Sequence, residues 1–269
     1  MKKKVVALLV AAMALCLCAV ALAGCGSKNE PAPFEGKVLM GFDIDGYEPY
    51  GYMDDNGEYV GFDIDLATEV CARNGWDLEL CPVAWDSIQA EMDSGNINCV
   101  WNGLTRTDER EDAFALTEDY MYNAQVVVVK ADAGYEALAD LSGKKIVTQS
   151  GAPAYDLLAE DYAEDINIDD VELVAGYTTA FMEIESGTAD AVACDFSVAN
   201  AQMAAKPDVY KILTFLNEEA YCVAFNKAYT DVAEQVSDTL REMYADGTVE
   251  AICAKWADSG INFDDWKLK

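Results

Sequence analysis

The stretch Asn98-Cys99-Val100-Trp101-Asn102-Gly103-Leu104-Thr105-Arg106-Thr107-Asp108-Glu109-Arg110 joins a short apolar segment to a polar turn. Residues 97–101 predict a buried strand, which Asn102 and Gly103 are expected to end, and Gly103 lets another molecule approach the backbone closely. Thr107 predicts a helix cap. Arg110 would then lie just beyond the strand, where a guanidinium can hold a carboxylate through two hydrogen bonds. Taken alone, the stretch also fits an ordinary strand, turn and helix with a surface arginine.

Strand and helix patterns alternate around this stretch. A helix is expected from a cap at Asp63 to Gly75, and the other predicted elements before residue 102 are strands at 38–42, 78–83 and 97–101 and a helix at 87–94. Such alternation predicts parallel βαβ units and hence an α/β fold. Ligands in such folds bind beyond the carboxyl ends of the strands, where the loops 43–50 and 103–110 are expected.

The same pattern begins again in the second half of the chain. Its predicted elements are strands at 145–148, 171–174 and 190–194 and helices from Pro153 and at 178–186. We therefore predict two similar α/β lobes: residues 37–120 begin lobe 1, residues 121–221 form lobe 2, and residues 222–269 return to complete lobe 1. The two crossings are expected near Tyr120–Ala124 and near Glu218–Val223, and such a pair of crossings forms a hinge.

The N-terminus predicts export. Three lysines at positions 2–4 precede an apolar run from Val5 to Ala23, and Leu22-Ala23-Gly24-Cys25 follows. A single membrane-spanning helix also fits this length, although no positive flank follows the run. The box is similar to a bacterial lipoprotein signal, which implies removal of residues 1–24, lipidation of Cys25 and a tether over residues 25–36. Two acyl chains would hold the protein stably on the outer face of the cytoplasmic membrane.

Composition excludes several classes of function. The net charge of −31 argues against nucleic acid and anionic membrane surfaces as partners. The chain has no histidine, which excludes Ser-His-Asp and Cys-His catalysis and the usual zinc sites. We expect no metal and no cofactor. The six cysteines after Cys25 are expected to be small buried hydrophobes, while disulfide pairing stays open; they are Cys71, Cys81, Cys99, Cys194, Cys222 and Cys253.

Three segments together resemble the polar amino-acid family (family 3) of ABC-transporter solute-binding proteins. They are Gly61-Phe62-Asp63-Ile64-Asp65-Leu66-Ala67, Gly103 to Arg110, and Asp190-Ala191-Val192-Ala193-Cys194-Asp195, and the resemblance extends over nearly all of Val38 to Trp256. It implies a periplasmic-binding-protein-like fold of type II and a monomeric receptor outside the cytoplasm. Such a receptor binds a free amino acid and delivers it to a membrane permease with its ATPase.

The resemblance also implies a ligand site. The carboxylate clamp falls on Arg110, with help from Gly103 and Thr105, and the ammonium acceptor falls on Asp195 of the second lobe. The platform for the ligand's side chain falls on Tyr47 and Trp85, and Asp43 lies at or near the acid that reads that side chain. The site is completed by Asn102, Gln149, Gly151 and Ala152. Gly151-Ala152-Pro153 departs from the family's Gly-Thr-Thr, so a hydroxyl contact is missing, and the loop 43–49 is one residue longer than usual.

Physical chemistry supports this placement. A free amino acid is a zwitterion, so Arg110 and Asp195 on opposite lobes would satisfy its two ends, and the ligand would favour the closed state. For Asp195 a solvated strand-end acid is an equal alternative. Core packing is the expected role of Trp101, whereas Trp85 opens a helix after a strand and is expected to line the cleft.

The loop after the first strand predicts the ligand's side chain. Asp43, Asp45, Tyr47 and Glu48 combine acids with an aromatic ring, which suits a cationic or polar amino acid of the arginine, lysine and glutamine class rather than glutamate or leucine. Arg106 is expected to point outward, opposite to Thr105. Two other functions remain open: an enzyme similar to cyclohexadienyl dehydratases, which would need a positioned acid or base, and a sensory ligand-binding module.

Overall fold

The computed structural model describes residues 33–167 and 170–269. The predicted signal peptide, Cys25 and most of the tether lie outside these residues. Among the helices that are described, none has the length and apolar character needed to cross a membrane.

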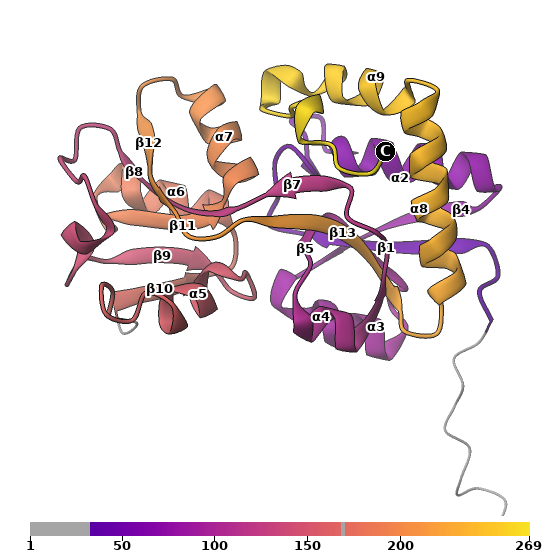
Figure 1. Ribbon diagram of the computed structural model, residues 1–269, viewed down its shortest axis with the longest axis horizontal. Helices are drawn as coiled ribbons and strands as arrows, with labels where there is room; N and C mark the ends of the chain where they lie inside the picture. Colours follow the sequence, from indigo (N-terminus) through magenta and orange to yellow (C-terminus); the bar gives the residue numbers. More distant parts are fainter. Residues whose placement is uncertain (1–32, 168–169) are drawn as a thin grey trace, which may run out of the picture. The chain divides into compact units, whose positions relative to one another are not determined.

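The first sheet has the strand order β4-β1-β5-β13-β6, and β7 also pairs with β13 (Figure 1). The neighbours β4, β1 and β5 are parallel, whereas β13 is antiparallel to β5, β6 and β7. The sheet is therefore mixed. Its strands are β1 (Lys37–Asp43), β4 (Asp77–Val83), β5 (Cys99–Thr105), β6 (Phe114–Leu116), β7 (Met121–Asn123) and β13 (Glu219–Asn226).

Helices cover both faces of this sheet. One face carries α2 (Phe62–Asn74), α8 (Thr230–Ala245) and α9 (Thr248–Lys255), and the other carries α3 (Ile88–Ser94) and α4 (Asp108–Ala113) (Figure 1). Successive residues of β5 feed two cores: Cys99 and Trp101 pack on one side, Val100 and Leu104 on the other. Short elements complete this lobe: β2 (Tyr52–Met53), β3 (Tyr59–Val60), η1 (Trp85–Ser87), η4 (Ala257–Ser259) and η5 (Phe263–Asp265).

The second sheet has the order β10-β9-β11-β8-β12. Its strands are β8 (Gln125–Lys130), β9 (Ile146–Gln149), β10 (Val171–Val174), β11 (Ala191–Asp195) and β12 (Tyr210–Phe215). Its helices are η2 (Leu138–Leu141), α5 (Ala154–Glu160), α6 (Tyr177–Ser186) and α7 (Phe196–Ala205). The sequence pattern did not predict β8 or α7. In β8, four valines at 126–129 alternate between two cores, so the strand is apolar on both faces.

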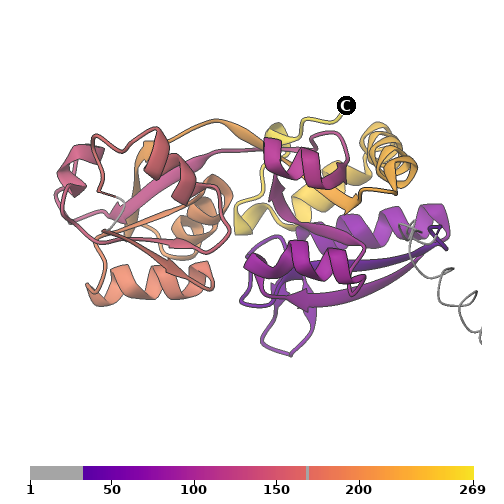
Figure 2. The ribbon, with the colours of Figure 1, turned by 90° about the horizontal axis from the view of Figure 1, so that it is seen from below.

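Two chain crossings join the sheets. Ala124 separates β7 from β8, and residues 216–218 separate β12 from β13. The crossings run side by side, because β7 pairs with β13 and β8 pairs with β12 (Figures 1 and 2). Residues of the two crossings are therefore neighbours although nearly one hundred positions separate them in sequence.

Most predicted element ends are confirmed. The α/β fold with two lobes is confirmed, and helices end at Gly75, Gly95 and Gly187, each in the left-handed region. The strands β2 and β3 pair antiparallel and form a hairpin around residues 55–57. Trp101 lies in the core as expected.

The prediction that Asn102 and Gly103 end the strand is wrong. The strand β5 continues to Thr105, because β13 pairs with it on both sides of an irregularity: Val100 lies opposite Ala224, and Leu104 lies opposite Cys222. Gly103 has a φ of 59° inside this bulge. A glycine can adopt that angle without strain, so the polar pair bends the strand instead of ending it.

The prediction that Asp63 caps α2 is also wrong. Gly61 occupies the cap position. Asp63 is the second residue of the helix, and its side chain is fully buried. A Cβ on Gly61 would lie 2.0 Å from the carbonyl oxygen of Tyr50. The loop that ends at Tyr50 therefore packs against the start of α2 only because residue 61 is glycine.

This close approach gives the first prediction. Gly61→Ala is expected to lower the free energy of unfolding by about 1–3 kcal/mol more than Gly75→Ala, because the new methyl group overlaps backbone atoms. Gly75 lies at the other end of α2 with a φ of 67° and open space around it, so Gly75→Ala reports the backbone strain alone, about 1–2 kcal/mol. Urea denaturation of both variants measures the difference, and equal losses would contradict the packing argument.

Candidate functional site

Arg110 lies where lobe 1 meets lobe 2. The Thr107 hydroxyl accepts the backbone N–H of Arg110 at 3.2 Å, which confirms the predicted cap and fixes the start of α4. The Arg110 guanidinium donates from Nη1 to the carbonyl of Thr105 at 2.7 Å and from Nη2 to the carbonyl of Gly151 at 3.2 Å. It also lies 6.0 Å from the ring centre of Trp85. Since Gly151 belongs to lobe 2, the side chain bridges the lobes.

Arg110 differs from the other three arginines of the chain. Arg73, Arg106 and Arg241 each form ion pairs with two carboxylates. Arg110 has no ion pair with any residue that the structure describes. Burial lowers the pKa of its guanidinium, against the pull of Asp195 and Glu219. A largely desolvated cation held only by carbonyls is a site for an anion, because a carboxylate would supply the missing charge.

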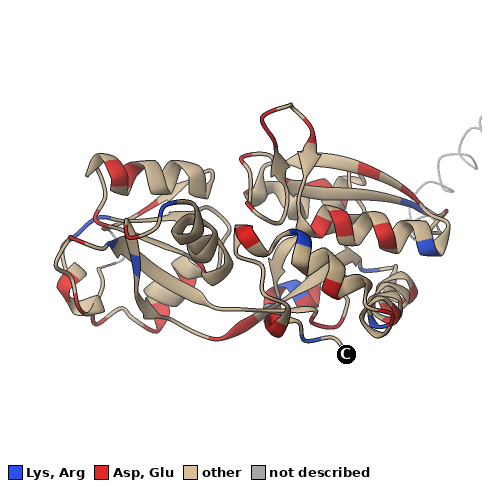
Figure 3. Ribbon diagram, turned by 90° about the horizontal axis from the view of Figure 1, so that it is seen from above, with Lys and Arg blue, Asp and Glu red and all other residues tan. Residues whose placement is uncertain are grey.

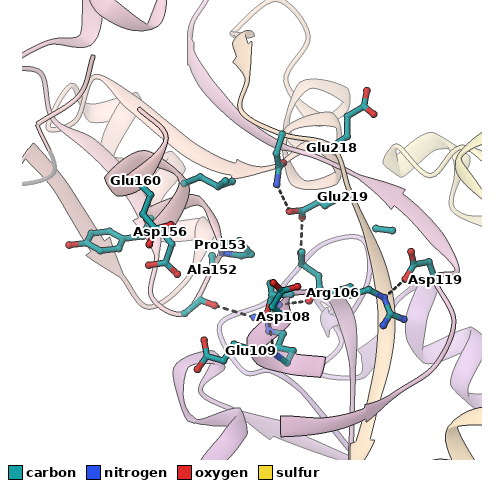
Figure 4. A pocket seen from close by; sticks show the side chains of 18 of the residues that line it. Arg106, Asp108, Glu109, Asp119, Ala152, Pro153, Asp156, Glu160, Glu218 and Glu219 are labelled. Carbon is teal, nitrogen blue, oxygen red and sulfur yellow. Dashed lines mark hydrogen bonds and ion pairs between the residues drawn. The ribbon is translucent and has the colours of Figure 1, made fainter. Parts of the chain in front are cut away.

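The charge of Arg106 is neutralised by acids of its own lobe. Its guanidinium pairs with Asp119 at 2.6 Å and with Glu111 at 2.8 Å, and Figure 4 shows it turned toward Asp119. It also donates to the carbonyl of Thr117. Arg106 lines the same cavity as Arg110, but its charge is already neutralised.

Asp195 supplies the buried acid of lobe 2. It ends β11 and is 4% exposed, so it is not the solvated strand-end acid of the alternative interpretation. Its Oδ1 accepts hydrogen bonds from the side-chain amides of Asn123 at 2.7 Å and Gln125 at 2.8 Å, and its Oδ2 accepts the Tyr177 hydroxyl at 3.1 Å. Burial, followed by the nearby charge of Glu219, raises the pKa of Asp195 to about 6. None of these partners is a cation.

Asp43 supplies a second buried acid, from lobe 1. It ends β1, its backbone N–H donates to Oδ1 of Asn102 at 3.0 Å, and its carboxylate accepts the side-chain amide of Gln149. Burial raises the pKa of Asp43 to about 6. Gln149 ends β9 in lobe 2, so this hydrogen bond is a direct link between the lobes. Of the acids predicted in this loop, only Asp43 is buried, because Asp45 and Glu48 are exposed.

Buried aromatic rings lie close to one another and to Arg110 in this region. Tyr47 and Trp85 are both buried, with ring planes 9° apart and centres 6.5 Å apart. The ring of Tyr177, from lobe 2, lies 6.0 Å from that of Tyr47. Parallel aromatic faces next to carboxylates suit a flat cation such as a guanidinium.

Two predicted donors are engaged within lobe 1. The Gly103 N–H donates to Oδ2 of Asp63 at 2.7 Å, and the Thr105 hydroxyl donates to Oε1 of Glu219 at 2.7 Å. A ligand contact at either donor would therefore compete with an existing hydrogen bond. Asn102 is buried, and its Nδ2 has no partner among the described residues.

Arg110 lines a cavity of about 1110 Å³, which Figure 4 shows from close by. Four predicted site residues line it: Thr105, Arg110, Gly151 and Ala152. The other seven are buried and do not line it: Asp43, Tyr47, Trp85, Asn102, Gly103, Gln149 and Asp195. Arg110 connects the cavity to the buried residues, because it lines the cavity and its guanidinium lies close to the ring of Trp85. Acidic residues outnumber basic ones in the wall, and the ribbon of Figure 3 marks acidic positions on both lobes. Such a field attracts cationic solutes.

Several polar residues around the site were not predicted. They are Asp63, Tyr120, Asn123, Gln125, Tyr177, Glu219 and Tyr221. Asp63 lies in a segment that the sequence singled out, but only its cap role was considered. Asn123 and Glu219 lie within the predicted crossings. A polar residue in an otherwise apolar segment is the sequence feature that could have identified them. The six cysteines among the described residues are unpaired, and those residues include no cluster of His, Cys, Asp or Glu that fits a metal.

Two mixed α/β lobes, two crossings, and an unpaired cation facing buried acids define the class of two-lobed ligand-binding proteins. Residues 38–259 match the bacterial extracellular solute-binding proteins, family 3, and the chain belongs to this family.

Named relatives are binding proteins. The chain is 30% identical to the L-cystine-binding protein TcyA of Bacillus subtilis, covering 97% of this chain and 100% of TcyA. It is 29% identical to the arginine-binding extracellular protein ArtP of the same organism, covering 94% and 98%. A Streptococcus pneumoniae ABC uptake transporter substrate-binding protein with bound histidine has a similar structure, with a TM-score of 0.79, 28% identity, and coverage of 85% and 95%. These relatives are binding proteins, in agreement with the solute-binding family to which the chain belongs.

The Asp63 contacts give a prediction for the frame of the site. Asp63 accepts the Gly103 N–H and, at 2.8 Å, the Tyr120 hydroxyl. Asp63→Ala is expected to lower the free energy of unfolding by about 2–4 kcal/mol, because two buried donors lose their acceptor. Asp63→Asn keeps an acceptor and should lose less.

The same substitution has a defined pH dependence. Burial raises the pKa of Asp63 to about 7, above its value of about 3.9 in the unfolded chain. The stability that this shift contributes is present below about pH 3.9 and is lost as the pH rises through about 7. The stability of Asp63→Asn relative to the parent should therefore rise between pH 4.5 and pH 8 in urea denaturation. Asp55→Asn, at an exposed hairpin position, is the control, and a pH-independent difference for Asp63→Asn would refute the shift.

Proposed function

We propose that the protein is a receptor outside the cytoplasm that binds a free cationic or polar amino acid between its lobes and delivers it to an ABC permease with its ATPase. The observation that carries the proposal is the Arg110 guanidinium, which no described acid neutralises and which faces lobe 2. The names of the relatives support an amino acid as the ligand.

The two ends of the ligand bind to different lobes. The α-carboxylate binds to Arg110 of lobe 1, and the α-ammonium group binds to Asp195 of lobe 2. Neither lobe offers both charges in these positions, so the ligand stabilises the closed state through contacts that an open state lacks. The crossings at Ala124 and at residues 216–218 are the hinge for this closure. Asn102, Gly103, Gly151 and Ala152 complete the wall near the carboxylate.

The ligand's side chain extends toward Asp43 and lies along Tyr47 and Trp85. A buried carboxylate beside aromatic faces favours arginine or lysine, and the Gln149 amide that contacts Asp43 also suits an uncharged polar group. An ancestral arginine-binding protein, 34% identical over 82% of this chain and 98% of its own, with a TM-score of 0.72, has been solved with arginine bound. A similar ancestral protein, 33% identical, has been solved with glutamine bound.

Cystine is a second candidate ligand. TcyA is similar over the whole chain, and cystine carries two zwitterionic ends. The acidic cavity in front of Arg110 offers space and negative charge for a second ammonium group.

The N-terminal part of the proposal is a lipid anchor. Residues 1–24 form the signal peptide, Cys25 carries the lipid, and residues 25–36 form the tether on the outer face of the cytoplasmic membrane. The box Leu22-Ala23-Gly24-Cys25 and the extracellular character of the family support it. Cell fractionation tests the anchor, since Cys25→Ala should leave the membrane fraction, and unchanged membrane retention would refute it.

A ligand panel tests the proposed function. Arginine, lysine, histidine, glutamine and cystine are compared with glutamate and leucine by thermal shift. A ligand at about 100 times its dissociation constant stabilises the fold by roughly 2.7 kcal/mol, which raises the midpoint by about 5–10 °C. The largest shift is expected with arginine or lysine. A largest shift with cystine would support the second candidate, and one with glutamate or leucine would contradict the assignment of the side-chain end.

Substitution of Arg110 tests the carboxylate clamp. Arg110→Ala is expected to weaken binding by about 2–5 kcal/mol in calorimetry, because the ligand's carboxylate loses its buried partner. Arg106→Ala is the matched control: it removes an arginine of the same segment whose charge Asp119 and Glu111 neutralise, so affinity should change by less than about tenfold. Equal losses in the two variants would place the carboxylate elsewhere.

A further inference from the structure

Two acids are held together at the point where the crossings meet. The side-chain amide of Asn123 donates to Oδ1 of Asp195 at 2.7 Å and to Oε1 of Glu219 at 2.6 Å. The amide of Gln125 donates to the same two oxygens, at 2.8 Å each. An amide NH₂ group has two hydrogens, so each amide gives one hydrogen to each acid. The two carboxylates are therefore near neighbours, joined by four hydrogen bonds.

The pair of Asp195 and Glu219 connects the two crossings and the cavity. Asn123 and Gln125 flank Ala124 in the first crossing, and Glu219 begins β13 directly after the second. Glu219 also accepts the Thr105 hydroxyl at 2.7 Å and the Asn217 amide at 3.0 Å. Glu219 lines the cavity (Figure 4). One acid of the pair thus lines the cavity while the other is buried behind it.

No described cation neutralises the pair. Neither acid has an ion pair with a described lysine or arginine, and Arg110, which interacts with both electrostatically, donates instead to two carbonyls. The other titratable groups that face Asp195 are uncharged tyrosines and a thiol, whose pKa values burial raises: Tyr47, Tyr50, Tyr177, Tyr221 and Cys194. Glu219 in turn faces Tyr122 and Tyr177.

Physical chemistry limits the charge of such a pair. Two adjacent carboxylates without a counter-ion do not both ionise easily, because each disfavours the charge of the other. Burial is the larger cause of the raised pKa of Asp195, and the nearby charge of Glu219 raises it further. In addition, Oε1 of the fully buried Gln125 has no partner among the described residues, so a third acceptor stands beside the two acids. The two carboxylates and Oε1 of Gln125 could together bind one positive charge, which no described residue supplies.

We propose that Glu219 determines specificity at the ammonium end of the ligand: it forms with Asp195 a pair that holds one positive charge, a proton in the free protein at mildly acidic pH and the ligand's ammonium group in the complex. This inference rests on the proposed function. When the ammonium group enters, the proton leaves to solvent, so the pair and its bound cation carry a net charge of −1 before and after. Binding therefore releases a proton at mildly acidic pH.

The exchange predicts how affinity depends on pH. Below the pKa of Asp195, about 6, the ligand competes with a proton, and affinity should fall by up to about tenfold for each pH unit. Above that pH Asp195 is already ionised, and affinity should be constant. A ligand without an ammonium group would gain nothing from the pair.

Calorimetry with arginine, at pH 5 and pH 8 in two buffers of different ionisation enthalpy, counts the released protons. The parent should release close to one proton at pH 5 and about none at pH 8. Glu219→Gln should release measurably less at pH 5, because the part of the raised pKa of Asp195 that Glu219 adds to the effect of burial is then lost. Glu234→Gln, an exposed substitution on α8, should match the parent. No release by the parent, or equal release by parent and Glu219→Gln, would overturn the proposal.

A second readout needs no ligand. The raised pKa of Asp195 stabilises the fold below about pH 3.9, and this stability is lost as the pH rises through about 6. Glu219→Gln removes the repulsion, so its thermal midpoint relative to the parent should be higher at pH 8 than at pH 4. If no amino acid binds, the proposed function fails, but this comparison of thermal midpoints still tests the repulsion between Asp195 and Glu219. An equal difference between variant and parent at both pH values would refute that repulsion.

Discussion

A guanidinium without a carboxylate partner is the constraint around which the site is built. Arg110 is held by the carbonyls of Thr105 and Gly151 and lies over Trp85. Carbonyl groups orient the cation but carry no net charge, so the positive charge of the guanidinium is not neutralised. The acids that face it, Asp195 and Glu219, are already joined to each other through amides. A zwitterionic ligand can satisfy both sides at once, and because Asp195 belongs to lobe 2 while Arg110 and Glu219 belong to lobe 1, it would then contact both lobes.

The frame of the site depends on a buried acid that a ligand does not need to touch. Asp63 in α2 accepts the N–H of Gly103 in β5 and the hydroxyl of Tyr120 beside the first crossing. It therefore ties a helix, the bulged strand and the hinge region together. Because Thr107 begins α4 only two residues after β5 ends, the geometry of the bulge also sets the position of Arg110. The stability of this core and the geometry of the site are thus coupled.

Local patterns predicted most of the fold. Helix ends at glycine, the Thr107 cap and the alternation of strands with helices depend on neighbouring residues, and these predictions were confirmed. The continuation of β5 was missed because it depends on β13, more than one hundred positions later. The role of Glu219 was missed for the same reason: its partners Asn123 and Gln125 are distant in sequence. Arg110 and Asp195 were identified through segments typical of a family, whereas their burial follows only from tertiary contacts.

The crystal structure of the protein with its preferred amino acid, found from the panel, tests the central claim most directly. We expect the ligand's carboxylate to make two hydrogen bonds to the Arg110 guanidinium and its ammonium group to lie within hydrogen-bonding distance of Asp195, with the side chain along Tyr47 and Trp85. A ligand whose carboxylate is bound away from Arg110, or which contacts one lobe alone, would contradict it.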